Sequence, residues 1–525
     1  MSDVTTSQQA GMWPEADLTD GKPASALAAP ETEREPRLKV VNRDQLLLRA
    51  VDVDKLVERD HLVRAIWELT ARLDLSGFTA DVDSVEGVAG RPAFDPRLLI
   101  SLWVCAYSEG VSSAREIERR CAYHPAYQWL TGCEVINHHT LSDFRIQHQE
   151  ALDALFAQAL GVLSSEGLIT LERVMHDGTK IKASASGKSF HREKTLRAHL
   201  EAAQERVRAM GDPRQEEPRR HQVCARERAA REKVERLEKA LKEMAKVQPT
   251  ARSGSKSEPR VSETDPEARI MKQGDGGCAP SHNVQISTDA AHGIVVGASV
   301  TQSPVDWGQL VPALQEIKHQ NGRLPEQVVV DGGFTTREAV LAMAELGVDL
   351  IGGTIEDGAQ ANARQLKQRT FDPAFRAESF RYDAEADTYT CPADNVLRHQ
   401  GARDDRIGIT RHVYRARAAD CRDCSFRERC CLGVSTRTIV RKEIAPTIAA
   451  YVAKMQTEAA QKIYRLRGAV AEFPNAWLKS KLGLRQFCLR GLKKVRCEVL
   501  WACLTYNIQQ WIRLRWKARL SAAPA

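Results

Sequence analysis

The order of strand-like and helical segments in the middle of the chain most constrains its fold. Short apolar runs alternate there with amphipathic segments, and turn residues separate them. Runs of this length predict strands, and spaced apolar residues predict helices. The expected elements are strands at Leu171–Ala183, His282–Thr288 and Ile294–Val300, a helix at Asp306–His319, a strand at Gln327–Val330, a helix from Thr336 to Leu346, and a strand at Val348–Ile351.

This order predicts an α/β fold built on a five-stranded mixed sheet. Three antiparallel strands come first, and right-handed strand–helix–strand crossovers follow. That is the order of the ribonuclease H-like fold, in which the first and fourth strands are neighbours. We therefore expect Leu171–Ala183 and Gln327–Val330 to lie side by side, although a long charged segment separates them in the chain.

Three acidic residues stand at positions that suit a metal-dependent site. Asp177 ends the half-apolar run in the first strand, Asp331 follows Val328–Val330, and Glu472 lies in a basic C-terminal stretch. Converging carboxylates can hold two divalent cations for in-line attack on a phosphodiester. Each residue also has an ordinary interpretation: both aspartates precede glycine, as turn residues do, and Glu472 fits a surface salt bridge.

Glu472 and Lys479 are seven residues apart and would share a face of an unbroken helix. Pro474 lies between them, and we expect it to kink or restart that helix.

Composition and periodicity divide the chain into an all-α N-terminal part and an interrupted α/β core. Within the N-terminal part, Asp95 and Pro96 are typical of a helix start. Arg145 and neighbouring arginines suggest a DNA-binding helical module, and an ordinary helical packing domain is the alternative. The expected boundaries are a disordered tail at 1–40, the helical domain at 41–165, the first part of the core at 166–355 with a helical hairpin inserted at 190–262, a cysteine-containing insertion at 356–445, and C-terminal core helices at 446–520.

The charge distribution points to a polyanionic partner. The chain is 42% hydrophobic and 28% charged, as soluble globular proteins are. Residues 461–520 contain fourteen Lys or Arg but only two acidic residues. Such an excess suggests nucleic acid, and a merely basic surface is the alternative. With no membrane-length apolar run and no signal sequence, we expect a cytoplasmic protein.

A cluster of cysteines suggests a second metal. Cys421 and Cys424 are separated by two residues, and Cys430 follows, with Cys391 thirty residues upstream of Cys421. This spacing allows four thiolates to reach one tetrahedral zinc ion. Reduced buried cysteines, an iron–sulfur centre and a redox pair are the alternatives.

The chain resembles bacterial insertion-sequence transposases of the DDE class, from about residue 43 to residue 516. The resemblance rests on the order of several blocks, since each block alone is weak. In chain order they are Gly90-Arg91-Pro92 through Thr140–Arg145, His176-Asp177-Gly178-Thr179-Lys180, Asp265–Arg269 with Asn283–Gln285 and Asp289, Val330–Phe334, and the Tyr-Arg-Glu-Lys set Tyr464, Arg467, Glu472 and Lys479. One departure is that four residues separate Arg467 from Glu472, where many relatives have three.

The resemblance implies a mechanism and a set of partners. Asp177, Asp331 and Glu472 would hold Mg²⁺ or Mn²⁺ and catalyse cleavage and strand transfer at the ends of a transposon. The partners would be double-stranded DNA, as terminal inverted repeats and target, and a second copy in a synaptic homodimer. The protein would be bacterial, and associated with the nucleoid when bound to DNA. The expected DNA-binding residues are Tyr464, Arg467, Lys479, Arg490, Lys493, Lys494 and Arg145.

Three alternatives remain at this point: a domesticated DNA-binding relative without catalysis, another ribonuclease H-like nuclease, and, more remotely, a zinc-dependent regulator. The last would leave the three acidic residues unexplained. A strand-transfer assay separates a transposase from a nuclease that needs no paired DNA ends.

Overall fold

The computed structural model describes residues 50–80, 82, 92–210, 220–247, 258–355, 372–405 and 408–522. The expected tail at 1–40 and the Gly90-Arg91 pair lie outside the described residues.

The described part of the N-terminal region is helical, as expected. Its helices are α1 (Leu62–Thr70), α2 (Pro96–Ser108), α3 (Ala114–Tyr123), α4 (Pro125–Thr131), α5 (His138–Gln147) and α6 (Gln149–Ser165). Helix α2 begins as the sequence predicts: Pro96 is its first residue, and the carboxylate of Asp95 accepts a hydrogen bond from the backbone N–H of Arg97 at 2.8 Å. Helix α1 begins at Leu62, with His61 as its N-cap.

The central sheet has six strands. They are β1 (Arg173–Lys182), β4 (Arg269–Lys272), β5 (Cys278–Asp289), β6 (Val295–Thr301), β7 (Gln327–Val329) and β8 (Asp349–Ile351). Strand β5 pairs antiparallel with β1, β4 and β6, whereas β1 pairs parallel with β7 and β7 parallel with β8. The expected neighbour relation between the first and fourth strands is therefore present in β1 and β7. Strand β4 was not expected.

The register of β1 and β7 brings the two aspartates to the same level of the sheet. The last parallel pair is Met175 with Val329. Asp177 and Asp331 each lie two residues further on. Asp177 lies within β1, as the expected strand at Leu171–Ala183 implies, because the antiparallel partner β5 continues to pair with β1 as far as Lys182. It lies at the point where the parallel neighbour ends.

Two helices connect the parallel strands. They are α9 (Leu310–Asn321) and α10 (Arg337–Leu346). Helix α10 begins as predicted, since the hydroxyl of Thr336 accepts a hydrogen bond from the N–H of Ala339 at 3.1 Å. It ends at Gly347, whose φ of 70° suits glycine. Helix α9 begins four residues later than predicted, which leaves Asp306 in the loop before it.

The C-terminal region is a series of helices that completes the hydrophobic core. They are α14 (Pro446–Met455), α15 (Glu458–Arg465), α16 (Arg467–Ser480), α17 (Leu492–Trp511), a π-helical turn (Ile512–Trp516) and α18 (Lys517–Ala522). Pro474 lies inside α16 without ending it, contrary to the expected restart of the helix.

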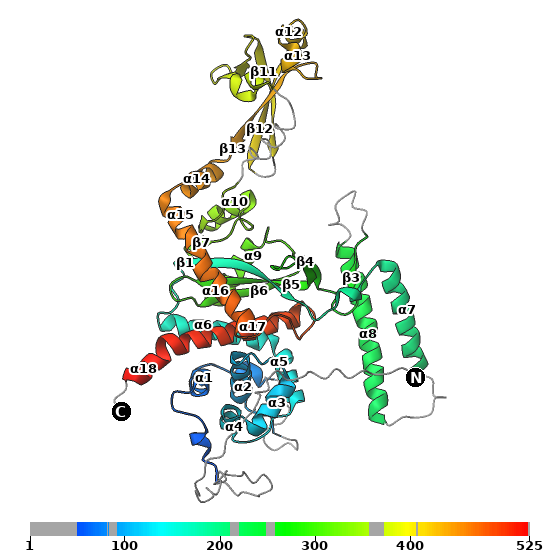
Figure 1. Ribbon diagram of the computed structural model, residues 1–525, viewed down its shortest axis with the longest axis vertical. Coiled ribbons are helices and arrows are strands. Elements are labelled where there is room, and N and C mark those ends of the chain that lie inside the picture. The colour runs from blue at the N-terminus through cyan, green and yellow to red at the C-terminus, as the bar shows by residue number, and fades with distance from the viewer. Residues whose placement is uncertain are drawn as a thin grey trace, which may run out of the picture. The chain divides into compact units, whose positions relative to one another are not determined.

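Helix α17 is buried on nearly all sides and packs against β6, α2 and α6 (Figure 1). One hydrophobic cluster extends from the N-terminal helices through the sheet to α17. The side chain of Asn507 donates to the carbonyl of Val295 and accepts from its N–H, both at 2.8 Å. This clamp satisfies backbone groups of β6 that have no further strand beside them.

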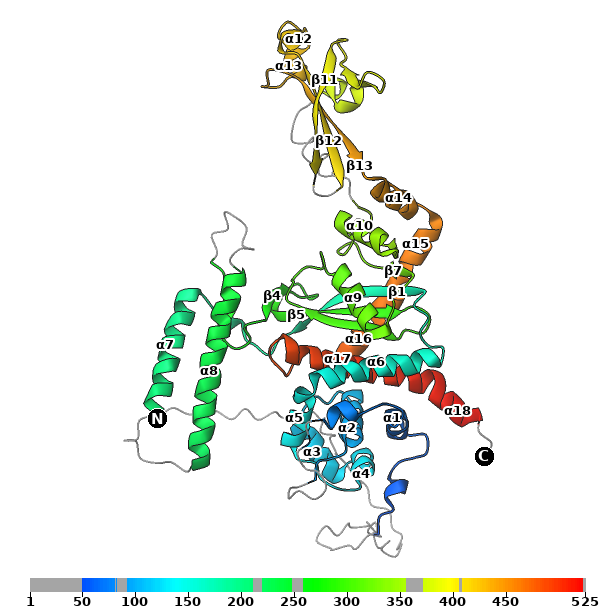
Figure 2. The same cartoon turned by 180° about the vertical axis from the view of Figure 1, so that it is seen from behind.

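The expected helical hairpin insertion is present as α7 (Glu193–Met210) and α8 (Arg220–Val247), which lie side by side in both views (Figures 1 and 2). Leu237 and Met244 of α8 are buried in one cluster with Leu196 of α7. Two short paired strands, β2 (Phe190–His191) and β3 (Val261–Ser262), form the root of the hairpin.

The cysteine-containing region forms a second, antiparallel sheet. Its strands are β9 (Arg381–Asp383), β10 (Thr388–Thr390), β11 (Val396–Asp405), β12 (Ile409–Ala416) and β13 (Thr438–Ile444), each paired with the next along the chain. Two short helices, α12 (Ala418–Arg422) and α13 (Arg427–Cys430), lie between β12 and β13. Across the described ranges, no helix is both long and apolar enough to span a bilayer.

Candidate active site

Helix α16 closes over the face of β1 that carries Asp177. The side-chain amide of Asn475 donates a hydrogen bond to Oδ2 of Asp177 at 3.0 Å. Burial raises the pKa of Asp177 to about 6, and the negative charge of Asp331 adds to this rise, whereas Arg467 opposes it. The two aspartates therefore interact electrostatically, as their register in the sheet requires.

Arg467 connects Asp177 with Glu472. Its guanidinium is 3.9 Å from Oδ1 of Asp177 and 3.8 Å from Oε1 of Glu472. The side chain of Glu472 is 63% exposed, whereas that of Asp177 is 18% exposed. Glu472 thus lies at the open side of the site, and the cation between the two acids reduces their mutual repulsion.

Asp331 is held by the turn that follows β7. Its Oδ1 accepts hydrogen bonds from the backbone N–H groups of Gly333, at 2.7 Å, and Phe334, at 3.3 Å. Gly353 lets a neighbouring segment approach this turn closely, because a Cβ there would meet the Cα of Gly332 at 2.6 Å. Asp331 is therefore both a turn residue and a part of the site, so its two sequence interpretations are compatible.

Lys479 lies further along α16 and is half-buried. Burial lowers its pKa, and the nearby charge of Asp177 opposes this effect. Because α16 is unbroken, Arg467, Glu472, Asn475 and Lys479 all come from one helix. The sequence did not single out Asn475, although its spacing of three residues from Glu472 is typical of a shared helix face.

Asp306 is a further acid beside this site that sequence reasoning missed. Side chains alternate along a strand, so Gly178 faces the opposite side of β1 from Asp177. On that side Asp306 Oδ1 accepts hydrogen bonds from the side-chain amides of Asn283, at 2.9 Å, and Gln285, at 3.3 Å. A Cβ on Gly178 would meet Asp306 Oδ1 at 2.6 Å, and one on Gly333 would lie 3.8 Å from Asp306.

Asp306 therefore packs beneath the two backbone segments that carry Asp177 and Asp331. The sequence predicted Asp306 at the start of a helix, and no local signal indicated its position in the loop after β6. His176 belongs to the same side: its ring nitrogens contact Ser287 Oγ at 2.9 Å and Gln285 Oε1 at 3.0 Å. Burial lowers the pKa of His176 to about 4, so its ring is neutral at pH 7.

The ligand atoms of Asp177, Asp331 and Glu472 are not all in mutual contact. Among the described residues, the His, Cys, Asp and Glu group whose ligand atoms all lie within 4.8 Å of one another is a different one, His191, His199 and Glu263. The donor chemistry at the aspartates still suits hard divalent cations, since all three side chains are carboxylates. Oδ1 of Asn475 is buried there without a hydrogen-bond partner, so a further oxygen donor is available.

Four of the expected DNA-binding residues lie near or beyond α16. Lys493 and Lys494 are exposed in the first turn of α17, and Arg490 is exposed just before it. Arg490 also donates to the backbone carbonyl of Ser184 at 3.0 Å. Tyr464 on α15 is half-buried and packs against the main hydrophobic cluster.

Arg145 differs from the expectation. Its side chain is buried, with 6% exposed. The guanidinium lies 4.6 Å from the ring centre of Trp103 and donates to the carbonyl of Ser112 at 2.8 Å. The charge of Glu498 also favours its protonated form. Arg145 thus holds α5 against neighbouring elements, and it is not available to a phosphate.

Three of the four expected cysteines lie together with a fourth thiol, Cys431. Cys421, Cys430 and Cys431 share a small hydrophobic cluster, and the half-buried Cys391 packs against it, whereas Cys424 is not among its members. Burial raises the pKa of Cys431 to about 12, and Cys421 and Cys430 add to the rise. The expected set of Cys391, Cys421, Cys424 and Cys430 stays a prediction, and Cys431 is a further thiol beside Cys421 and Cys430.

Comparison with known families gives two matches. Residues 51–147 match a family described as "Transposase domain (DUF772)", which spans α1 to α5. Residues 390–512 match "Transposase DDE domain", a segment that contains Glu472 but neither Asp177 nor Asp331. A search of curated proteins found no match.

Both ends of the chain thus resemble transposases, which indicates a role in DNA transposition. The two matches support the resemblance to DDE transposases of insertion sequences noted from the sequence, which is thereby confirmed.

Proposed function

We propose that this protein binds transposon-end DNA and catalyses metal-dependent cleavage and strand transfer with Asp177, Asp331 and Glu472. The observation that carries this proposal is the convergence of three distant segments: β1, the turn after β7, and α16. Arg467 contacts Asp177 of β1 and Glu472 of α16, and the charge of Asp331 raises the pKa of Asp177. We infer that the sheet β6–β5–β1–β7–β8 is ribonuclease H-like, which its pairing pattern supports.

The residues fit a divalent cation such as Mg²⁺, because the site offers carboxylates and the unpartnered Oδ1 of Asn475. Asp177, Asp331 and Glu472 would hold it. Bound divalent cations supply an activated water or 3′-hydroxyl and stabilise the leaving oxygen. The chain itself would orient Asp177 through Asn475 and place Lys479 and Arg467 beside the scissile phosphate. Contacts of this kind position the DNA without reading its sequence.

Exposed basic residues outside the site would track the DNA backbone. Arg490, Lys493 and Lys494 are the exposed members of the expected DNA-binding set. Tyr464 precedes them in the chain and follows the second sheet. Arg145 is omitted because it is buried. Two transposon ends must be joined in transposition, so we propose a homodimer as the active form.

We also propose a structural zinc ion in the second sheet, held by Cys391, Cys421, Cys430 and Cys431. The backbone N–H groups of Ala393 and Asn395 donate to Sγ of Cys391 at 3.4 and 3.3 Å. Hydrogen bonds of this kind hold the sulfur in place beside the other thiols, and a set of four thiolates is a common structural zinc site.

The test of the catalytic proposal is end cleavage by Asp177→Asn, Asp331→Asn and Glu472→Gln. Each variant should lose cleavage by a factor of at least about 10² while its DNA affinity stays near the wild-type value. Asp275→Asn, in the exposed turn between β4 and β5, is the control and should cleave normally. Wild-type cleavage by any of the three active-site variants would contradict the assignment.

A further inference from the structure

A compact group of metal-binding side chains lies at the root of the helical hairpin, apart from both sites described above. His191 is in β2, His199 is in the second turn of α7, and Glu263 directly follows β3. The chain therefore contributes one residue before the hairpin, one inside it and one after it.

The three side chains point toward a common centre. Nδ1 of His199 lies 2.8 Å from Oε2 of Glu263, and Nε2 of His191 lies 4.0 Å from its Oε1. The two imidazole rings meet edge to face, with centroids 5.1 Å apart. One ligand atom from each residue lies within 4.8 Å of the others, and all three residues are half-buried.

We propose that His191, His199 and Glu263 bind a zinc ion. Two imidazoles and one carboxylate form a common zinc ligand set, and three protein ligands leave the fourth position to water. The alternative is that Glu263 only accepts hydrogen bonds from the histidines. That arrangement satisfies His199, but it leaves His191 beyond hydrogen-bonding distance, whereas a shared ion would engage both rings.

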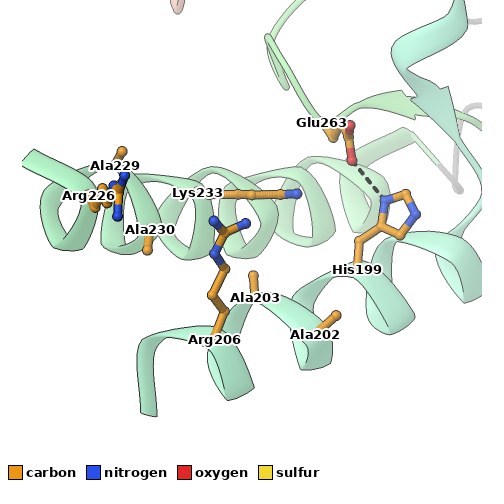
Figure 3. A pocket seen from close by; sticks show the side chains of 9 residues that line it. All are labelled: His199, Ala202, Ala203, Arg206, Arg226, Ala229, Ala230, Lys233 and Glu263. Atoms are coloured by element: carbon orange, nitrogen blue, oxygen red, sulfur yellow. Dashed lines mark hydrogen bonds and ion pairs between the residues drawn. The ribbon is translucent and has the colours of Figure 1, made fainter. Parts of the chain in front are cut away.

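The surroundings of the site allow an ion and its water to enter. His199 and Glu263 lie at one end of a pocket of about 380 Å³ between α7 and α8 (Figure 3). Arg226 marks the other end of this pocket, and Arg206 and Lys233 lie between the two ends, with the Lys233 side chain extending toward the end that holds Glu263 (Figure 3).

A zinc ion at this point would join the two ends of the hairpin. His199 and Glu263 are 64 positions apart in the chain, and the strands β2 and β3 pair over only two residues each. Closing a loop of this length restricts the unfolded chain and stabilises the folded root. The ion would thus hold the direction in which α7 and α8 leave the core.

Zinc content of the full chain tests the proposal. The protein is stripped with a chelator, reloaded with zinc and freed of loose metal by gel filtration before the zinc is counted. The double variant His191→Gln/His199→Gln should retain one zinc ion fewer per chain than the wild type. His139→Gln, an exposed histidine on α5, is the matched control and should retain the wild-type number. The cysteine site contributes the same zinc content to the wild type, the double variant and the control.

A second measurement separates metal binding from misfolding. Zinc should slow proteolysis of the hairpin in the wild type and the control, but not in the double variant. If the double variant loses its native circular dichroism spectrum, Glu263→Gln is used, because glutamine keeps the shape and the hydrogen bond to His199. Equal zinc content in Glu263→Gln and wild type, or equal protection by zinc, would overturn the proposal.

Discussion

Asn475 on α16 donates a hydrogen bond to Asp177 on β1, although 298 positions separate them in the chain. This contact fixes how the C-terminal helix lies over the sheet. The same helix carries Arg467, which contacts both Asp177 and Glu472. Glu472 is therefore positioned through Arg467, which also contacts Asp177.

The charge of Asp177 should cost stability in the absence of metal. Burial raises its pKa from 3.8 to about 6, so the folded state binds the proton more tightly than the unfolded state. Stability should then fall as pH rises between these two values. Asp177→Asn removes the charge and should be more stable than the wild type at about pH 8, by up to about 3 kcal/mol, and nearly equal to it at about pH 3.

Urea unfolding in a chelating buffer at the two pH values measures this difference. Asp275→Asn is the control, because this aspartate is exposed. A stability gap between Asp177→Asn and wild type that does not change with pH would contradict the role of burial.

Gly178 should not tolerate a side chain. A Cβ there would meet Asp306 Oδ1 at 2.6 Å and Gln285 Nε2 at 2.7 Å. Gly178→Ala should therefore displace Asp306 or β1, lowering the free energy of unfolding by about 1–3 kcal/mol, and end cleavage should fall with it. Gly187→Ala, where nothing lies within 4 Å of the added Cβ, should leave both unchanged. Thermal unfolding and cleavage assays on the same preparations compare the two variants.

DNA affinity should depend on salt through the exposed lysines of α17. Each neutralised phosphate contributes about −0.9 to the slope of log K against log salt concentration. Lys493→Gln/Lys494→Gln should make this slope less negative by up to about 1.8. Lys318→Gln, an exposed residue of α9, is the control. An unchanged slope in the double variant would exclude these two lysines from the DNA interface.

Zinc in the second sheet should depend on Cys431 and not on Cys424. Cys421→Ser and Cys431→Ser should each lower the zinc content per chain, because both thiols belong to the buried cluster. Cys424→Ser should leave the zinc content at the wild-type value. Loss of zinc in Cys424→Ser with retention in Cys431→Ser would restore the ligand set expected from the sequence.

Local signals predicted the elements of the sheet well. Thr336, Asp95 with Pro96, and the apolar run before Asp331 act through backbone groups only a few residues away, so their effects can be recognised from sequence. The neighbour relation of β1 and β7 followed from the order of the elements, because few sheet topologies agree with it.

Burial was harder to predict, because it depends on what packs against a residue from elsewhere in the chain. Arg145 appeared basic and exposed, but Trp103, Ser112 and Glu498 surround it. Asp306 appeared to begin a helix, but it lies in a loop beneath Gly178. Neither the burial of Arg145 nor the loop position of Asp306 has a signal in the neighbouring sequence.

The sequence by itself determined the strand and helix order, the three candidate acids and the class of protein, because these depend on local pattern and motif spacing. Only the tertiary structure decided how the acids are held. The unbroken path of α16 through Pro474, the contact of Asn475 with Asp177 and the burial of Cys431 with Cys421 and Cys430 all arise from packing between distant segments. Such contacts form only when folding brings those segments together, so no stretch of the chain alone specifies them.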